Sequence, residues 1–260
     1  MVSKSHWIVA LCLITSAAQA GMQEGYKAYQ EGDYPLAFKE FRQMAWEGNK
    51  DVQFFLGLMY ASGQGVAKDE KEGAIWYEKS AKQGYAGAQV NLGHLYYKGD
   101  GVPQDYEKAV FWYRVAAVQG LAQAQYSLGL MYDFGLGVRA DLKEAANWYR
   151  KAADQGYASA QHNLGVFFQQ GKGSSPDLKE AAVWFEKAAQ QGYLPSQFNI
   201  GYMYDQGDGV AADLILAYKW IFLAARAGDE KSRTWQSSLE SRMTPEQIEM
   251  AKALAAEWKK

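Results

Sequence analysis

The sequence predicts an all-α protein made of stacked antiparallel helix pairs, and three observations support this prediction. A pattern of glutamine, leucine, glycine and tyrosine recurs every 36 residues, as from Gln89 to Gln125. Apolar residues within the pattern lie three or four positions apart, which is the spacing of one helix face. Glycines and an aspartate separate the two helical stretches of each copy. Because such a unit cannot bury its apolar face alone, we expect the copies to stack into a solenoid.

Residues 1–20 are typical of an export signal. Lys4 supplies a positive start, residues 7–15 are apolar, and Ala18 and Ala20 are small residues where a signal peptidase cleaves. The apolar run is well short of the ~20 residues that span a bilayer. We therefore predict a signal peptide over residues 1–20, cleaved after Ala20, and a periplasmic or secreted chain.

The composition limits the kinds of partner. With 48% hydrophobic and 22% charged residues, the chain has the composition of a folded protein. Its formal net charge is −2, and loss of Lys4 with the signal peptide makes it one unit more negative. Such a charge, spread over many helices, provides no phosphate-binding face, so we predict no nucleic-acid partner. No later stretch is apolar enough to cross a membrane, so we predict no membrane span.

Cys12 is the single cysteine and lies within the predicted signal peptide. A lipoprotein anchored at Cys12 would have bulky Leu11 where a small residue is preferred, which disfavours that alternative. The mature chain then has no thiol, disulfide or cysteine-based metal site. We predict neither a metal ion nor a cofactor.

The repeats divide the rest of the chain. Residues 21–48 form a shortened capping repeat, with helices expected over 22–31 and 36–47. Residues 229–260 form C-terminal capping helices, the second one capped by Thr244. Five full repeats lie between these ends and span residues 49–84, 85–120, 121–156, 157–192 and 193–228.

The first helix of each repeat, here called the A helix, contains a glycine that costs roughly 1 kcal/mol relative to alanine. A cost repeated five times indicates close approach by the second helix, the B helix. Leucine or isoleucine at −1 and an aromatic residue at +3 from this glycine lie on the same side of the A helix. The five glycines are Gly57, Gly93, Gly129, Gly165 and Gly201.

A Gly-x-Gly-Val loop follows the A helix in four copies, and glycine there can end the helix at positive φ. The fourth copy lacks the valine, because residues 171–175 read Gly-Lys-Gly-Ser-Ser. The loop does not indicate a nucleotide site, since no strand precedes it and Gly-Lys-Ser/Thr is absent.

An aspartate then opens each B helix as a predicted N-cap. In three copies a glutamate follows three residues later (Glu72, Glu144 and Glu180), which predicts capping boxes and accounts for the paired carboxylates without acid catalysis. A tryptophan lies seven residues after each aspartate, on the predicted buried stripe with alanines. The aspartates are Asp69, Asp105, Asp141, Asp177 and Asp213, and the tryptophans are Trp76, Trp112, Trp148, Trp184 and Trp220.

The pattern Ala/Gln-x-x-Leu-Gly-x-x-Tyr-x-x-Gly-x-Gly-Val-x-x-Asp-x-x-x-Ala-x-x-Trp-Tyr-x-x-Ala-Ala-x-x-Gly resembles the Sel1-like repeat, a longer-looped relative of the tetratricopeptide repeat. The resemblance covers residues 49–228 in full and 21–48 in shortened form. It implies a right-handed α/α superhelical solenoid that acts as a protein-binding scaffold. Exported bacterial members are associated with cell-envelope assembly, signalling or host interaction.

One branch of that family is cysteine-rich, with a disulfide in each repeat, and some of its members are described as binding or hydrolysing β-lactams. The repeats of this chain contain no cysteine, which disfavours that activity. None of the serines in the repeats lies in Ser-x-x-Lys or Gly-x-Ser-x-Gly. We therefore predict no enzyme. A cell-wall-related or β-lactam hydrolase and a carbohydrate- or peptidoglycan-binding envelope module stay open as alternatives.

In stacked helix pairs the A helices line a concave wall, where we expect a protein or peptide to bind. Positions −3, +1, +4 and +5 from the A-helix glycine are predicted to face this groove, and they vary between copies while the packing positions do not. The oligomeric state is left open. The predicted groove residues are Phe54, Leu58, Val90, His94, Tyr97, Lys98, Tyr126, Leu130, Asp133, Phe134, His162, Gln169, Gln170, Phe198, Tyr202, Asp205 and Gln206.

His94 and His162 lie two repeats apart, and neither is accompanied by a cysteine or a second histidine. Their separation disfavours a shared metal site. No nucleophile or orienting group recurs near them in the pattern, so we interpret both as groove or surface residues.

Overall fold

The computed structural model describes residues 21–258, and every regular element in this range is a helix. This confirms the all-α prediction. The predicted signal peptide, residues 1–20, lies outside the described residues. The helices form two compact units, one ending at Gln119 and one beginning at Gly120.

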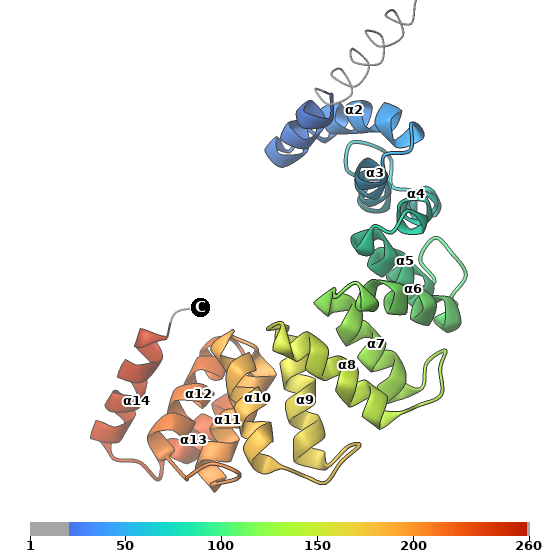
Figure 1. The fold of residues 1–260 in the computed structure, drawn as a ribbon. Coiled ribbons are helices and arrows are strands. Elements are labelled where there is room, and N and C mark those ends of the chain that lie inside the picture. Colours follow the sequence, from blue (N-terminus) through green and yellow to red (C-terminus); the bar gives the residue numbers. More distant parts are fainter. Residues whose placement is uncertain (1–20, 259–260) are drawn as a thin grey trace, which may run out of the picture. The chain divides into compact units, whose positions relative to one another are not determined.

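Each unit is a series of antiparallel helix pairs in chain order (Figure 1). The first unit contains a helix over residues 21–31, then α2 (Tyr34–Trp46), α3 (Lys50–Ser62), α4 (Glu70–Lys82), α5 (Ala86–Lys98) and α6 (Tyr106–Val118). The second contains α7 (Ala122–Phe134), α8 (Leu142–Asp154), α9 (Ala158–Gln170), α10 (Leu178–Gln190), α11 (Leu194–Gln206), α12 (Leu214–Arg226), α13 (Glu230–Glu240) and α14 (Pro245–Glu257). The A helices are α3, α5, α7, α9 and α11, and α4, α6, α8, α10 and α12 are the B helices.

The A-helix glycines make the close approach that the sequence predicted. A Cβ placed on Gly129 would lie 2.6 Å from Cδ1 of Tyr149, which is buried on the facing B helix. The same relation holds in every repeat, because the residue eight positions after the capping aspartate lies over the glycine. These pairs are Gly57 with Tyr77, Gly93 with Tyr113, Gly129 with Tyr149, Gly165 with Phe185 and Gly201 with Ile221.

The A helices end and the B helices begin at the residues that the sequence predicted. Each A helix ends at a glycine in the left-handed region, as at Gly63 with φ +75°. Each predicted aspartate N-cap accepts backbone N–H groups of the first turn; Asp141, for example, accepts from Lys143 and Glu144. The glycines and aspartates of each repeat therefore determine where the A helix ends and where the B helix begins.

Of the two hydrogen bonds in each predicted capping box, at Glu72, Glu144 and Glu180, only one forms, so the prediction of complete boxes is wrong. Each glutamate N–H donates to its aspartate carboxylate, but the aspartate N–H does not donate to the glutamate side chain. That N–H donates instead to the carbonyl of the A-helix aromatic residue, as from Asp141 to Tyr132 at 3.0 Å. Only one donor is available, and the loop geometry gives it to the backbone. The complete box forms at Thr244, where no such carbonyl competes and Gln247 Oε1 accepts at 2.9 Å.

The A-helix glutamine is a buried link between helices. Nε2 of Gln161 donates to the carbonyl of Ala153 on the preceding B helix, 3.1 Å away. Oε1 of Gln161 accepts from Nε2 of Gln191, which ends the B helix of its own repeat, at 2.7 Å. We call this pair of hydrogen bonds the glutamine bridge. Because buried amides need partners, the bridge explains why glutamine occupies this position in the first four repeats; in the fifth, Gln197 keeps only the bond to the preceding helix, to the Ala189 carbonyl at 3.2 Å.

Candidate protein-binding surface

Position +5 is the most exposed part of the predicted groove. It lies at the last residue of each A helix, before the left-handed glycine. Its occupants differ in chemistry, which gives each A helix a different exposed end. They are Ser62, Lys98, Phe134, Gln170 and Gln206.

Helix α7 carries the most apolar of these faces. Tyr126, Leu130 and Phe134 follow one another at intervals of four residues, so they form one stripe along the helix. Tyr126 and Leu130 are half-buried, whereas Phe134 is 67% exposed. An exposed phenylalanine next to half-buried apolar side chains is a typical anchor point for a protein partner.

Helix α5 presents a more polar version of the same stripe. His94 and Lys98 are exposed, and Tyr97 stacks with the His94 ring at 6.4 Å between centroids. Lys98 Nζ lies 5.9 Å from the centre of the Tyr97 ring. In the other A helices, Leu58, Gln169 and Tyr202 are half-buried at their groove positions. The predicted groove residues therefore lie on A-helix faces, with unequal exposure.

Position −3 has a packing role that the sequence prediction did not include. Val90 and Phe198 are buried. Tyr126 lies between Tyr149 of its own B helix and Tyr157 at the start of the next A helix, with centroids 5.8 and 5.2 Å away. The same arrangement occurs in two other repeats: Phe54 lies between Tyr77 and Tyr85, and His162 lies between Phe185 and Tyr193. Position −3 thus joins consecutive repeats.

Two aspartates of the predicted groove are held by internal hydrogen bonds. Asp133 accepts from the Tyr149 hydroxyl at 3.2 Å, and Lys172 Nζ lies 3.9 Å from its other oxygen. Burial raises the pKa of Tyr149, and the nearby Asp133 charge raises it further. The hydroxyl therefore stays protonated and remains a donor.

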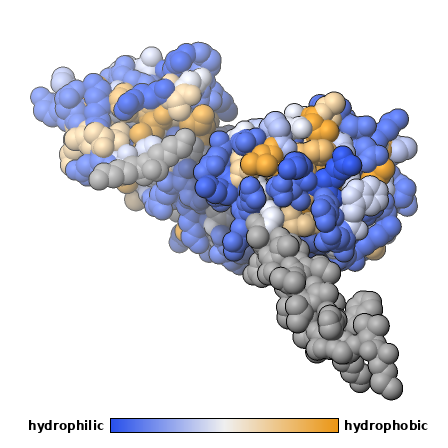
Figure 2. Space-filling model, turned by 90° about the horizontal axis from the view of Figure 1, so that it is seen from above, coloured by the Kyte–Doolittle hydropathy of each residue, from blue (hydrophilic) through white to orange (hydrophobic). Residues whose placement is uncertain are grey.

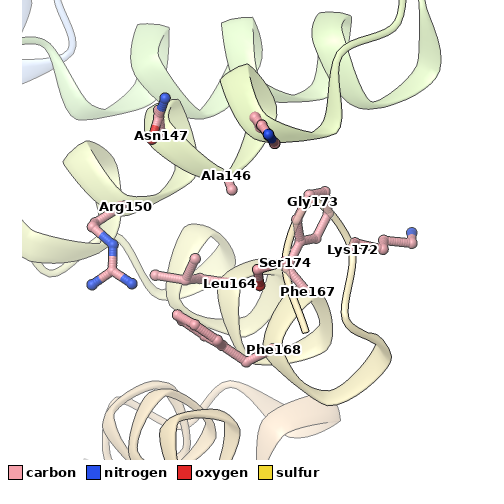
Figure 3. Close-up of a pocket in the computed structure, with 10 residues that line it drawn as sticks. Ala146, Asn147, Arg150, Leu164, Phe167, Phe168, Lys172, Gly173 and Ser174 are labelled. Atoms are coloured by element: carbon pink, nitrogen blue, oxygen red, sulfur yellow. The ribbon is translucent and has the colours of Figure 1, made fainter. Parts of the chain in front are cut away.

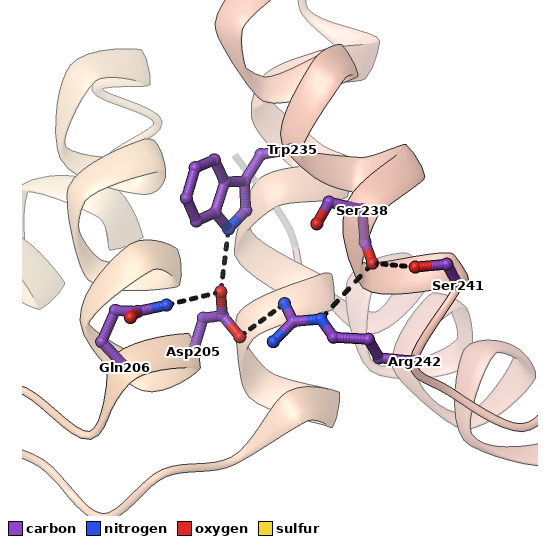
Figure 4. A network of polar contacts seen from close by, with 6 residues as sticks. All are labelled: Asp205, Gln206, Trp235, Ser238, Ser241 and Arg242. Carbon is purple, nitrogen blue, oxygen red and sulfur yellow. Dashed lines mark hydrogen bonds and ion pairs between the residues drawn. The ribbon is translucent and has the colours of Figure 1, made fainter.

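Asp205 anchors α13 to the last repeat (Figure 4). Its carboxylate accepts from Trp235 Nε1 at 3.1 Å, from Gln206 Nε2 at 2.9 Å and from an Arg242 guanidinium nitrogen at 2.7 Å. Its side chain is only 1% exposed. The Trp235 ring packs on Tyr202, 5.1 Å between centroids. The groove face of α11 is therefore largely occupied by α13.

His162 and Ser196 form a pair that sequence reasoning missed. Nδ1 of His162 lies 2.8 Å from Oγ of Ser196, a distance found between catalytic bases and nucleophiles. However, Ser196 is fully buried, and burial lowers the pKa of His162 to about 4. A substrate cannot reach the hydroxyl, and so weak a base does not activate it near neutral pH. The pair joins α9 to α11.

Within residues 21–258, no group of three or more His, Cys, Asp or Glu side chains is placed to hold a metal ion. None of the described helices is both long enough and apolar enough to cross a membrane. On the face shown in Figure 2, hydrophobic residues form small patches in a largely hydrophilic surface.

A pocket of about 320 Å³ lies in the second unit, between α8, α9 and the loop that follows α9 (Figure 3). One feature of the sequence indicates this pocket, namely the valine missing from the fourth loop. Ser174 replaces that valine and lines the pocket. No residue of the predicted groove is among its lining residues.

Comparison with known proteins agrees with this architecture. The model of the Sel1 repeat family matches five consecutive segments of the chain. A curated protein of Rhizobium leguminosarum bv. viciae, an exopolysaccharide production negative regulator, is 37% identical over 60 residues, which are 23% of this chain and 22% of that protein. The family model matches residues 50–85, 86–121, 122–157, 158–193 and 194–229.

Two solved structures are similar over most of this chain. The first is c5321, a protective antigen of uropathogenic Escherichia coli with an SLR fold, at 32% identity and a TM-score of 0.85. This chain is covered to 90% but spans only 51% of that protein. The second is a Sel1 repeat protein from Oxalobacter formigenes, at 30% identity and a TM-score of 0.77, with 89% and 96% of the two chains covered. The fold, the repeat pattern and these matches agree, and the chain belongs to the Sel1 repeat family.

Proposed function

We propose that this chain is an exported, non-catalytic scaffold that binds a protein or peptide through the exposed faces of its A helices. The observation that carries the proposal is the stripe of Tyr126, Leu130 and Phe134 on α7, which ends in an exposed aromatic ring. The partner that fits such a stripe is an amphipathic helix or extended peptide with apolar side chains. Sel1 repeats are protein-interaction modules, which supports this choice.

The cellular setting is proposed from two observations. The first 20 residues are typical of a cleaved export signal. The second is the short match to a protein named as an exopolysaccharide production negative regulator, which supports an envelope-related role. We infer a role in cell-envelope assembly, signalling or host interaction, exerted from the periplasm or outside the cell.

The absence of catalysis is part of the same proposal. It is supported by the Ser196 hydroxyl, which is enclosed, and by the weak basicity of His162. Nitrocefin or peptidoglycan turnover by the purified chain would contradict it.

Site-specific photo-crosslinking tests the binding face. A photoreactive phenylalanine analogue is introduced at Phe134, and, as a matched control, at Phe111, which is 56% exposed on a B helix. We expect mass spectrometry of crosslinked cells to show a protein attached at position 134 that is absent at position 111. Equal capture at both positions would show that the A-helix face is not the binding surface.

Export is tested separately. Cell fractionation should recover the chain outside the cytoplasm, and N-terminal sequencing of the recovered protein should begin at Gly21. A full-length chain that remains in the cytoplasm would contradict this part of the proposal without affecting the binding face.

A further inference from the structure

The loop valine of the repeats is a packing residue. Val66 packs on a core cluster that includes α2, Val102 on one that includes α4, and Val210 on one that includes α10. In each case this helix belongs to the preceding helix pair. The valine side chain therefore fills a gap between one repeat and the next.

The fourth repeat leaves this gap open. Ser174 stands at the valine position and is exposed. The loop also lies farther from the preceding pair. A Cβ on Gly173 would be 3.0 Å from the Leu142 carbonyl oxygen, whereas the corresponding distances at Gly65, Gly101 and Gly209 are 2.2, 2.3 and 2.2 Å. Both observations place the pocket where a side chain and close loop packing are missing.

The floor of the pocket is apolar. Leu164 and Phe167 are buried, and Figure 3 shows Leu164 and Phe168 lying between Arg150 at one end and Ser174 at the other. Ala146 of α8 covers the middle. A pocket of this kind suits an aliphatic side chain, since the sibling repeats place one at the same point.

All ionisable side chains that line the pocket are basic. Arg150 lies with its guanidinium 5.3 Å from the Phe168 ring centre, which holds it beside the apolar floor. Lys143 is exposed on the same helix, α8. Lys172 points away from the other lining residues in Figure 3 and lies 3.9 Å from an Asp133 oxygen. Arg150 and Lys143 are therefore the cations available to a ligand.

We propose that this pocket, the Ser174 pocket, binds an acidic peptide segment of a partner protein through one branched aliphatic side chain. That side chain occupies the space that the loop valine fills in the sibling repeats. Carboxylates next to it in the peptide pair with Arg150 and Lys143. The proposal rests on the proposed function in that the partner is a protein, but it uses a different surface from the A-helix stripe.

The test is a titration of the full mature chain, followed by amide NMR. The probe is N-acetyl-Glu-Val-Glu-amide, compared with the Glu-Ser-Glu and Lys-Val-Lys peptides. We expect saturable shifts at Gly173 and Ser174 with the first peptide, and at least tenfold weaker binding of the other two. Equal binding of all three peptides, or no binding of the first, would overturn the proposal.

Two variants make the test specific. Ser174→Val restores the sibling residue, so it should keep the fold and reduce peptide binding at least tenfold. Lys143→Gln should weaken binding of the acidic Glu-Val-Glu peptide severalfold. It should leave the ratio of affinities for the Glu-Val-Glu and Glu-Ser-Glu peptides unchanged. Unaltered binding of the Glu-Val-Glu peptide by the Ser174→Val variant would contradict the proposal. Free 3-methylbutanoate binding as tightly as the peptide would show a small-molecule site instead. Because neither variant alters α7, these experiments and crosslinking at Phe134 can fail independently.

Discussion

Gln191 donates from its side-chain Nε2 to Oε1 of Gln161, 2.7 Å away, and the same bond closes each of the first four repeats. The fifth repeat lacks it. Ala227 stands where the donor would be, and Oε1 of Gln197 is the buried carbonyl oxygen without a hydrogen-bond partner among the described side chains. This difference between repeats allows the glutamine bridge to be tested in both directions.

Removing the donor should destabilise the protein. Gln191→Ala leaves Gln161 Oε1 buried without its partner, and a buried acceptor left in this way costs about 1–3 kcal/mol. We expect a lower urea midpoint, measured by circular dichroism. Gln190→Ala is the matched control, because Gln190 is exposed on the same helix turn. An equal loss in both variants would mean that the bridge contributes nothing specific.

Adding the donor should have the opposite effect. Ala227→Gln supplies an amide to Gln197 Oε1 and should stabilise the chain by about 0.5–1.5 kcal/mol. The gain should disappear in a Gln197→Ala background, which removes the acceptor. A gain of the same size in both backgrounds would show that the new residue acts in another way.

A methyl group on Gly129 should be costly even though alanine is the better helix former. The helix-propensity gain is about 1 kcal/mol, but the new Cβ would lie 2.6 Å from the Tyr149 ring. We expect Gly129→Ala to lower stability by about 1–3 kcal/mol through overpacking. Tyr149→Leu removes the ring, so Gly129→Ala should cost much less in that background. Calorimetric unfolding of the four proteins measures this coupling, and simple additivity would contradict the proposed clash.

Asp205→Asn should weaken the attachment of α13 to α11. The substitution removes the charge that faces Arg242 and weakens the bond from Trp235, at an expected cost of about 1–3 kcal/mol. Hydrogen exchange followed by mass spectrometry should show faster exchange over Glu230–Glu240, with little change in α7 to α9. Asp208→Asn, in the following loop, is the control. Unchanged exchange in α13 would show that apolar packing alone holds it.

His162 should make stability depend on pH. Because burial lowers its folded pKa to about 4 from its ordinary value of 6.5, the unfolded chain binds the proton more readily between these values. The contribution is complete above about pH 6.5 and is lost as the pH falls toward 4. Allowing for the partial exposure of the ring, we expect a loss of about 1–2 kcal/mol.

The comparison for this histidine is His162→Phe, since Phe54 and Phe198 occupy the same position in other repeats. The variant should show a smaller loss of stability between pH 7 and pH 4 than the original chain. His94→Phe serves as the control for the same replacement at an exposed position. Parallel pH profiles for the original chain and His162→Phe would contradict this account.

The sequence predicted the repeat architecture because the residues that set helix ends act locally. Gly63 and Asp69 fix a turn and a cap through their own backbone and side-chain chemistry. For packing between helices, the sequence predicted that a close contact exists but not which residues make it. The spacing indicated that something approaches Gly129, but identifying Tyr149 requires the register of two helices. The same spacing overlooked the residue at +2, Met131, which is buried.

The candidate surface was less predictable for a related reason. Asp133 and Tyr126 lie on the predicted side of α7, yet contacts with Tyr149 and Tyr157 reduce their exposure. Those contacts depend on how far neighbouring repeats rotate, which side-chain volumes determine. The Ser174 pocket shows the same limit, because its lining residues on α8 come from the previous repeat. Whether the predicted groove residues bind a partner stays a prediction.

The glutamine bridge also bears on how such chains change length during evolution. A repeat carries its own acceptor, such as Gln161, and its own donor, Gln191, and it binds its neighbour through a backbone carbonyl that every residue possesses. Duplication or deletion of a whole 36-residue repeat therefore leaves no amide unmatched at the new junction, whereas a change of one or two residues would shift the helices out of register. The hydrogen bonding favours growth and loss in whole repeats.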